Sequence, residues 1–259
     1  MRRYYADMEL RIIPIRGIPV PVKPGDDIAT LICEAAEKQG TPLLDGDVLV
    51  VSQKIVSKAR GLMFKLSEVK PSEEAIKISR ILGKPPELVE IILRETSRIV
   101  KLENKHIICE TRHGFVCANA GVDISNVDGG SSAVILPPNP DEEASKIREA
   151  IKRMKRIDVA VIISDTHGRP FRRGQVNVAI GVAGIKPLRD RRGERDLFGY
   201  VLKSKFIAIA DEVASAAELV MGQADEGVPA AIVRGLKYEK DESASIRDLI
   251  MSPEEDLFR

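Results

Sequence analysis

Apolar and polar positions along the chain change repeatedly between the period of a helix and the period of a strand. From residue 28 to residue 36 the apolar side chains recur at helical spacing, which predicts one buried stripe made of Ile28, Leu31, Ile32, Ala35 and Ala36. Asp26-Asp27 precedes this predicted helix and Gly40 ends it. Four apolar residues at 48–51 predict a buried strand that opens into a polar loop over 52–54.

Four further helices are predicted from caps and periodicity. Ser72 caps one helix that ends at Gly83, and Pro85-Pro86 begins the next. Asn139-Pro140 has the form of an N-cap followed by proline at the first helical position, and an acidic turn follows it. The last clear helix covers residues 211–221 and carries one apolar face.

Strand signals are mixed among these helices without a regular alternation. In residues 10–15 apolar and basic side chains alternate, which predicts a strand. Residues 107–117 predict two strands joined by a turn, and residues 159–163 predict a continuous apolar strand. Hairpins beside helices predict the α+β class, with mixed and antiparallel sheets and packed helices. We expect one unit spanning 1–259, with the best boundary candidate near 137–141 and residues 1–9 as an N-terminal extension.

Composition restricts the class of protein. Lys plus Arg total 40 and Asp plus Glu total 39, and this balance argues against nucleic acid as a partner. The chain is 44% hydrophobic, which suits a folded core rather than disorder. Apolar runs stay far below the roughly 18 residues of a membrane span, and the start of the chain has no apolar segment typical of a secretory signal. We therefore expect a soluble, cytoplasmic protein with no membrane partner.

The three cysteines bear on metal binding. Cys109, His113 and Cys117 are evenly spaced around the predicted turn. With a two-residue turn the cysteines point to opposite faces of the sheet, whereas a three-residue turn places them opposite one another. A fourth ligand is missing nearby, so we favour structural cysteines over a zinc site.

The strongest candidate for chemistry is the segment 165–174. Asp165 and Thr166 follow the apolar strand and run into three arginines, Arg169, Arg172 and Arg173. Carboxylate and hydroxyl oxygens suit Mg²⁺ or Mn²⁺, and arginine suits phosphate or carboxylate groups. Strand ends of open sheets favour binding sites, so we predict a metal–phosphate site over a solvated turn.

Three other polar groups are weaker candidates. The loop containing Asp123 and Asn126 is more often an Asx-turn than a ligand set. The group Ser52, Gln53, Lys54, Ser57 and Lys58 offers lysines that neutralise phosphates or simply solvate a face. The segment 221–228 has two interpretations: it binds a nucleotide base or a metal ion, or it simply ends the preceding helix. Phosphate-loop, dinucleotide, nucleophile-elbow and zinc-protease motifs are absent from the sequence.

Four ordered segments resemble the coenzyme F420-0:L-glutamate ligases, the GTP-dependent gamma-glutamyl ligases of archaea. These segments are residues 46–59, 119–126, 164–174 and 211–235, the last containing Met221-Gly222-Gln223. The resemblance runs in order from about Arg11 to Gly235. Four motifs in the same order are far more specific than any one of them.

The resemblance implies two interleaved α+β lobes, an intertwined homodimer and a ligase reaction. In that family GTP phosphorylates the terminal carboxylate of a deazaflavin precursor to give an acyl phosphate. The amine of L-glutamate attacks it, GDP and phosphate leave, and a second glutamate follows through a gamma-linkage. Two divalent ions (Mg²⁺ or Mn²⁺) and K⁺ assist.

The resemblance also implies site residues. Asp123 and Asp165 would hold one divalent ion, and Thr166 and Gln223 the other. The GTP-binding residues would be Gly17, Ile18, Pro19, Val20, Ser52, Gln53, Lys58, Asn126, Met221, Gly222, Gln223, Ala224, Asp225, Glu226, Gly227 and Val228. We assign the catalytic role on the transferring phosphoryl group to Arg169, Arg172 and Arg173.

Two alternatives remain at this point. One is a related nucleotide-dependent amide ligase that uses a different acyl acceptor. The other is a non-catalytic protein that binds a nucleotide and metal. The joint presence of the carboxylates, Thr166 and the arginines argues against the second alternative, since simple binding does not require them all.

Overall fold

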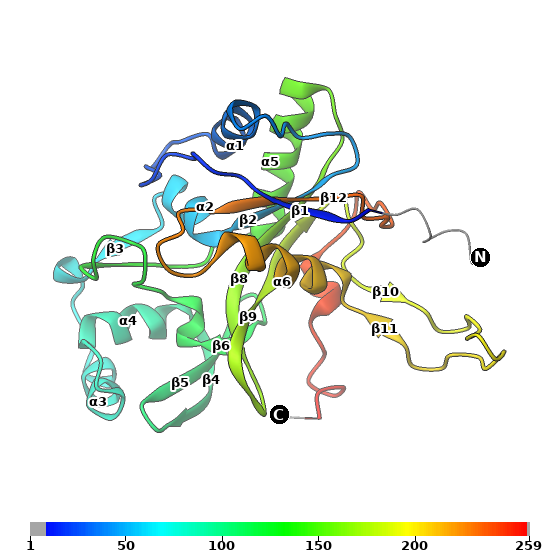
Figure 1. Ribbon diagram of the computed structural model, residues 1–259. Helices are drawn as coiled ribbons and strands as arrows, with labels where there is room; N and C mark the ends of the chain where they lie inside the picture. The colour runs from blue at the N-terminus through cyan, green and yellow to red at the C-terminus, as the bar shows by residue number, and fades with distance from the viewer. Residues whose placement is uncertain (1–8, 258–259) are drawn as a thin grey trace.

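The computed structural model describes residues 9–257, and a mixed five-stranded sheet lies at its centre (Figure 1). Its strands, in spatial order, are β1 (Arg11–Pro14), β12 (Ala230–Arg234), β2 (Val48–Ser52), β8 (Ala160–Arg169) and β9 (Arg172–Ala183). Only β2 and β8 are parallel, with Ser52 opposite Ser164, and the other neighbours are antiparallel. The predicted α+β class with mixed sheets is confirmed.

Helices cover this sheet and form the larger core. Every apolar residue of β2 is fully buried, because the strand is central and both faces of the sheet are covered. The helix α5 (Pro140–Lys155) packs on β8 and β9, and α1 (Ile28–Lys38) packs on α5. The helix α6 (Ile209–Met221) packs on β9, β1 and β12.

A second buried cluster is built from residues 62–135. It contains α3 (Glu73–Leu82), α4 (Pro86–Glu95), the sheet β4 (Thr96–Glu103), β5 (His106–Thr111) and β6 (Val116–Ala118), and the pair β3 (Met63–Lys65) and β7 (Ser132–Val134). Leu136 belongs to the larger core again, so the chain returns next to the predicted boundary at 137–141. The division into lobes and the intertwined dimer stay predictions.

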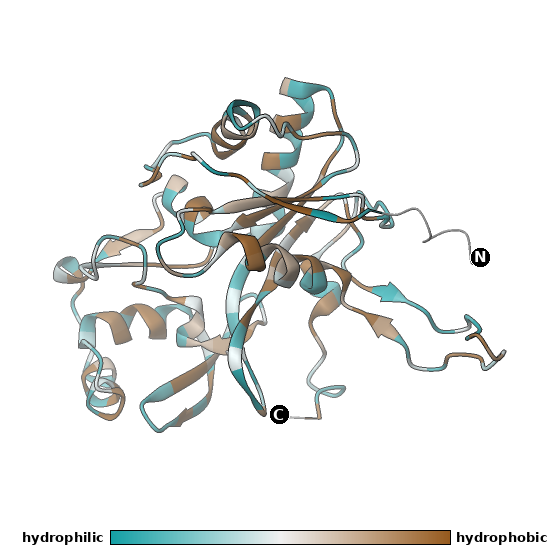
Figure 2. Cartoon of the chain, in the orientation of Figure 1, coloured by the Kyte–Doolittle hydropathy of each residue, from teal (hydrophilic) through white to brown (hydrophobic). Residues whose placement is uncertain are grey.

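An extended arm projects from the body beside α6 (Figure 1). Its paired base is β10 (Arg189–Asp190) and β11 (Phe206–Ile207). Near its tip Leu197 is 84% exposed and Phe198 is 96% exposed, which Figure 2 shows as a hydrophobic end. The short 3-10 helices are η2 (Leu66–Glu68), η3 (Asn119–Gly121) and η4 (Ile246–Leu249). Among the helices of residues 9–257, none has the length and apolar content to cross a membrane.

The capped helices agree with the prediction from sequence. Ser72 accepts a hydrogen bond from the backbone N–H of Ala75 at the start of α3, and Gly83 ends that helix in the left-handed conformation. Leu88, Ile91 and Ile92 of α4 are buried as expected. Residues 1–8 of the expected N-terminal extension lie outside the described residues.

Two local predictions are wrong. The polar segment 52–54 is not a loop, because Ser52 accepts from the backbone N–H of Lys54 and caps the helix α2 (Gln53–Ala59). The apolar strand at 159–163 does not end there. β8 continues through Arg169, because β9 provides the backbone partners of residues 164–169 whatever their side chains. Asp165 therefore lies within a strand rather than after one.

Candidate functional site

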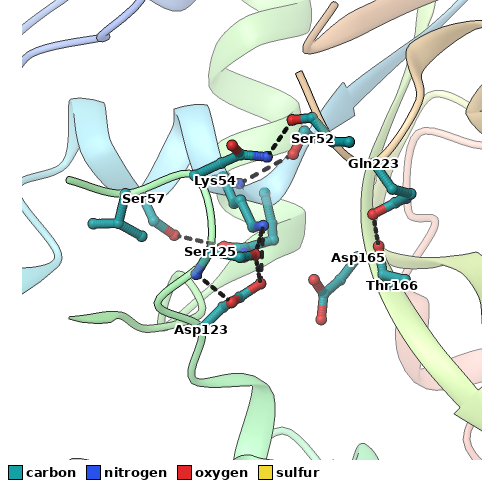
Figure 3. Close-up of polar contacts among 12 residues, drawn as sticks. Ser52, Lys54, Ser57, Asp123, Ser125, Asp165, Thr166 and Gln223 are labelled. Carbon is teal, nitrogen blue, oxygen red and sulfur yellow. Dashed lines mark hydrogen bonds and ion pairs between the residues drawn. The ribbon is translucent and has the colours of Figure 1, made fainter. Parts of the chain in front are cut away.

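A cavity opens beside the carboxyl end of β2 and the middle of the longer strand β8, which runs parallel to β2. Its lining comes from α2, β8, β9 and the loops around them: Val20, Ser52, Lys54, Ile55, Lys58, Asn126, Ser164, Asp165, Thr166, Asn177 and the continuous run 221–229. The parallel register places Ser52 beside Ser164, so the first turn of α2 and the polar half of β8 face one space. Figure 3 shows this arrangement of side chains.

Lys58 supplies a fixed positive charge from α2. Its Nζ donates to the carbonyl of Asn126 at 2.6 Å, and the whole residue is only 5% exposed. Burial, followed by the charge of Lys54, lowers the pKa of the Lys58 ammonium from its usual value. An anion entering the cavity would meet this ammonium without reorganisation of the chain.

Asp123 is held by Lys54 and by its own loop. Lys54 Nζ lies 2.9 Å from Asp123 Oδ2 and 2.8 Å from Ser125 Oγ, and the backbone N–H of Ser125 donates to Asp123 Oδ1 at 2.7 Å. Burial alone raises the pKa of Asp123, but Lys54 and Ser125 outweigh burial and leave that pKa below its usual value. The carboxylate is therefore ionised and fixed in direction. The loop has the Asx-turn form that the sequence suggested.

A second polar group faces this one from β8, β9 and the end of α6. Thr166 Oγ1 lies 2.8 Å from Asn177 Oδ1 and 2.9 Å from Gln223 Oε1. Gln223 Nε2 donates to the same Asn177 oxygen at 2.9 Å. These bonds bring together Thr166 and Gln223, which the resemblance assigns to one ion.

Asp165 lies between the two groups. Its carboxylate points into the space between Asp123 and the Thr166–Gln223 pair (Figure 3). Asp165 Oδ2 is 3.1 Å from His167 Nε2, so the histidine fixes one carboxylate oxygen from the next position on the same face of the strand.

The loop after α6 closes the cavity. Gly222 has φ +72° and ψ 178°, a backbone conformation that essentially only glycine adopts, and a Cβ there would also displace the side chain of Glu226. Glu226 accepts from the backbone N–H of Ala224 at 2.8 Å, and Asn126 Nδ2 donates to the Ala224 carbonyl at 2.8 Å. The loop is thereby tied to the segment that carries Asp123.

The donor set suits a hard divalent cation. Asp123, Asp165, Thr166 and Gln223 all present oxygen atoms, the ligand type that Mg²⁺ and Mn²⁺ prefer. Ser164 Oγ also lines the cavity; it is buried, and no hydrogen-bond partner exists for it among residues 9–257. Within that range no group of three or more His, Cys, Asp or Glu could hold a metal alone. An ion here would share its coordination with phosphate oxygens and water, as Mg²⁺ commonly does.

Not every residue carried over from the resemblance lines the cavity. Val20 does, whereas Gly17, Ile18, Pro19, Gln53 and Asp123 do not. Gln53 is the first residue of α2, and its side chain is buried. Arg169, Arg172 and Arg173 lie at the far end of the β8–β9 hairpin, outside the cavity of this single chain. Their catalytic role stays a prediction.

Among the polar lining residues, Ser164 and Asn177 were given no role from the sequence. Asn177 is a single amide between Val176 and Val178 in an apolar strand, and it is 4% exposed. A buried polar residue inside such a run usually has a specific partner. The sequence therefore indicates that Asn177 has a specific partner, but it does not identify that partner.

Of the evenly spaced cysteines, Cys109 belongs to the second core, and Cys117 is buried on the neighbouring strand β6. Cys109 and Cys117 lie opposite one another, so the longer of the two possible turns is present. Both are free and buried, and burial raises the pKa of each thiol. His113 contacts the carbonyl of Pro137 at 3.0 Å and stacks on Phe115.

Comparisons with known proteins agree on one family. The family profile described as F420-0:gamma-glutamyl ligase matches residues 17–235. The chain is 51% identical over 253 residues to the coenzyme F420:L-glutamate ligase of Methanothermobacter thermautotrophicus, covering 97% of this chain and 100% of the relative. Identity is 50% to the protein of that name from Methanopyrus kandleri, covering 95% and 98% of the two chains, and 47% to that from Methanocaldococcus jannaschii, covering 97% and 98%.

Proposed function

The chain belongs to the F420-0:gamma-glutamyl ligase family, an enzyme family, and we propose that it joins L-glutamate to coenzyme F420-0 in the cavity described above. Three named relatives that align over nearly the full length support this substrate pair. The observation that carries the assignment is the meeting of a buried ammonium, Lys58, with a carboxylate, Asp165, across one cavity. Formation of an amide from a carboxylate requires activation, and this combination suits the transfer of a phosphoryl group.

We propose GTP as the activating nucleotide. Lys58 and the run 221–229 would bind it, since a buried ammonium and a glycine-containing loop suit phosphates and a close backbone approach. The γ-phosphoryl group would pass from GTP to the terminal carboxylate of the acceptor, giving an acyl phosphate and GDP. The amine of glutamate would then attack the acyl carbon, lose a proton and release phosphate. A second glutamate would be added through a gamma-linkage.

The chain's own residues would position this reaction. Asp123 and Asp165 would hold one divalent ion and Thr166 and Gln223 the other, with Lys54 fixing the direction of Asp123. When bound, such ions neutralise charge on the transferring group. The cavity contains no triad of nucleophile, base and orienting group, and phosphoryl transfer does not require one.

The decisive experiment supplies the purified protein with GTP, Mn²⁺, L-glutamate and the deazaflavin precursor, and reads product masses. We expect products heavier by one and then two glutamyl residues, and none when GTP or glutamate is omitted. Trapping with hydroxylamine in the absence of glutamate would detect the acyl phosphate. Equal product with ATP would contradict GTP specificity, and product in excess chelator would contradict the metal assignment.

The same assay separates the alternatives. Product with another carboxylate acceptor but not the deazaflavin precursor would indicate a related amide ligase. Nucleotide binding without turnover of any acceptor would indicate a non-catalytic protein. Replacing K⁺ with Na⁺ tests the monovalent ion, since we expect activity to fall.

We also propose a homodimer. Light scattering would then give about twice the 28.5 kDa mass of one chain. A mass of one chain at working concentration would contradict this proposal.

A further inference from the structure

Asn177 is buried against the cavity and is the shared acceptor of two side chains. It lies on β9 directly opposite Thr166 of β8, and its Oδ1 atom is 2.8 Å from Thr166 Oγ1. Gln223 reaches the same oxygen from the end of α6 through its Nε2 atom, at 2.9 Å. One amide oxygen therefore accepts from two different elements of the fold.

The direction of the Thr166 proton is what Asn177 controls. A hydroxyl has one proton, and Thr166 Oγ1 lies within reach of two acceptors, Asn177 Oδ1 and Gln223 Oε1. When the proton goes to Asn177, Thr166 Oγ1 and Gln223 Oε1 are 2.9 Å apart with no proton between them. Both then present lone pairs, while the Gln223 amide N–H faces Asn177.

The distance between Thr166 Oγ1 and Gln223 Oε1 matches the distance between two adjacent ligands of an octahedral metal ion. In octahedral Mg²⁺ coordination the oxygens lie at roughly 2.0–2.1 Å, so two neighbouring ligands at a right angle are about 2.9 Å apart. Thr166 Oγ1 and Gln223 Oε1 already have this spacing. If Thr166 instead donated to Gln223, that hydrogen bond would occupy the lone pair that the ion needs.

We infer that Asn177 is a positioning residue for divalent-ion binding. It accepts the Thr166 hydroxyl proton and the Gln223 amide proton, and so leaves two oxygens free to act as adjacent ligands. Asn177 does not itself touch the ion or the reacting groups. The inference rests on the proposed function only for the presence of a divalent ion at Thr166 and Gln223.

Two substitutions separate the acceptor role from packing. Asn177→Asp keeps an acceptor oxygen in the same place, whereas Asn177→Leu keeps the approximate size and removes the acceptor. A matched control is Ser215→Ala, because Ser215 Oγ donates to the backbone carbonyl of Asn177 at 2.7 Å and not to its side chain. Titration with Mn²⁺ alone, followed by the electron paramagnetic resonance of the free ion, gives the affinity without any turnover. A thermal melt on each variant checks the fold.

We expect Asn177→Leu to weaken Mn²⁺ binding at one site by roughly 10- to 100-fold, the usual effect of removing a group that orients a metal ligand. Asn177→Asp should bind at least as tightly as the wild type, and Ser215→Ala should stay within about threefold by the same scale. Equal losses in the Leu and Asp variants, or an unchanged affinity in Asn177→Leu, would overturn the inference. Wild-type protein that binds no Mn²⁺ would overturn it together with the metal part of the proposed function. Ligation of glutamate by the wild type is a separate readout, so failure of the ligase proposal alone is distinguishable.

Discussion

Lys54 Nζ lies 2.9 Å from Asp123 Oδ2, and this ion pair ties the first turn of α2 to the loop that follows η3. Lys54 precedes Ile55 and Val56 of the larger core, and Asp123 follows Val122 of the smaller one. Their contact therefore joins the two parts of the fold on the side of the site opposite Thr166 (Figure 3).

The first prediction concerns the charge of Lys54. In Lys54→Gln we expect the KM for GTP to rise about tenfold, since one positive charge is lost from the lining of the cavity proposed to bind GTP. The melting temperature should change little, because a partly exposed ion pair contributes about 1 kcal/mol or less. Steady-state kinetics and a thermal melt measure both.

Ser125→Ala is the matched control for Lys54. It removes the hydrogen bond to Lys54 Nζ and leaves the charge in place. An equally large rise in KM in this variant would show that loop geometry, rather than charge, is responsible.

The second prediction concerns Asp165. Asp165→Asn keeps the size of the side chain and a polar contact with His167, so the fold should persist. Loss of the charge between the two oxygen groups should lower kcat by about 10²-fold or more, the scale for one preorganised electrostatic group. Asp211→Asn serves as the control, because Asp211 accepts from the backbone N–H of Ala179 but does not line the cavity. Near-normal turnover in Asp165→Asn would refute the metal role.

The third prediction tests the arginines at the hairpin tip. Arg172 is exposed and outside the cavity of one chain, so Arg172→Gln should leave the melting temperature unchanged. If Arg172 acts on the transferring phosphoryl group, kcat should fall at least tenfold. Unchanged kinetics in Arg172→Gln and Arg173→Gln would remove both from the catalytic residues.

The fourth prediction concerns thiols and pH. Burial raises the pKa of the Cys33 thiol to about 11 and that of the Cys117 thiol to about 12, from an ordinary value of 9.0. The native protein should therefore resist thiol reagents at pH 8, and denaturant should expose all three cysteines. Rapid modification of the native protein would contradict this.

The same shifts set the direction of the pH dependence. Between pH 9 and about 11 the unfolded chain loses thiol protons that the folded chain keeps, so the free energy of unfolding falls as pH rises. This contribution is fully present below pH 9. Melting temperatures measured across that range should decline, and more gently in Cys117→Ala. An equally steep decline in that variant would assign the effect to other groups.

The sequence by itself determined the elements whose signals are local. Ser72 and Gly83 mark the two ends of α3, and the apolar run of β2 identifies a central strand, because caps and periodicity act within one element. The ordered motifs also identified the family, and the run 221–228 that they highlight does line the cavity.

Only the tertiary structure decided what depends on a partner strand or a distant loop. Hydrogen bonds from β9 keep β8 extended through its polar half, and its register places Asn177 opposite Thr166. Cys109 lies opposite Cys117 on the neighbouring strand because the turn between the strands has three residues. The residue types did not decide between a two-residue and a three-residue turn. A polar residue within an apolar run shows from the sequence that a polar side chain is buried. Its role depends on the atoms that other elements place beside it. Asn177 has its role because β8 and the end of α6 both direct their donors to one oxygen.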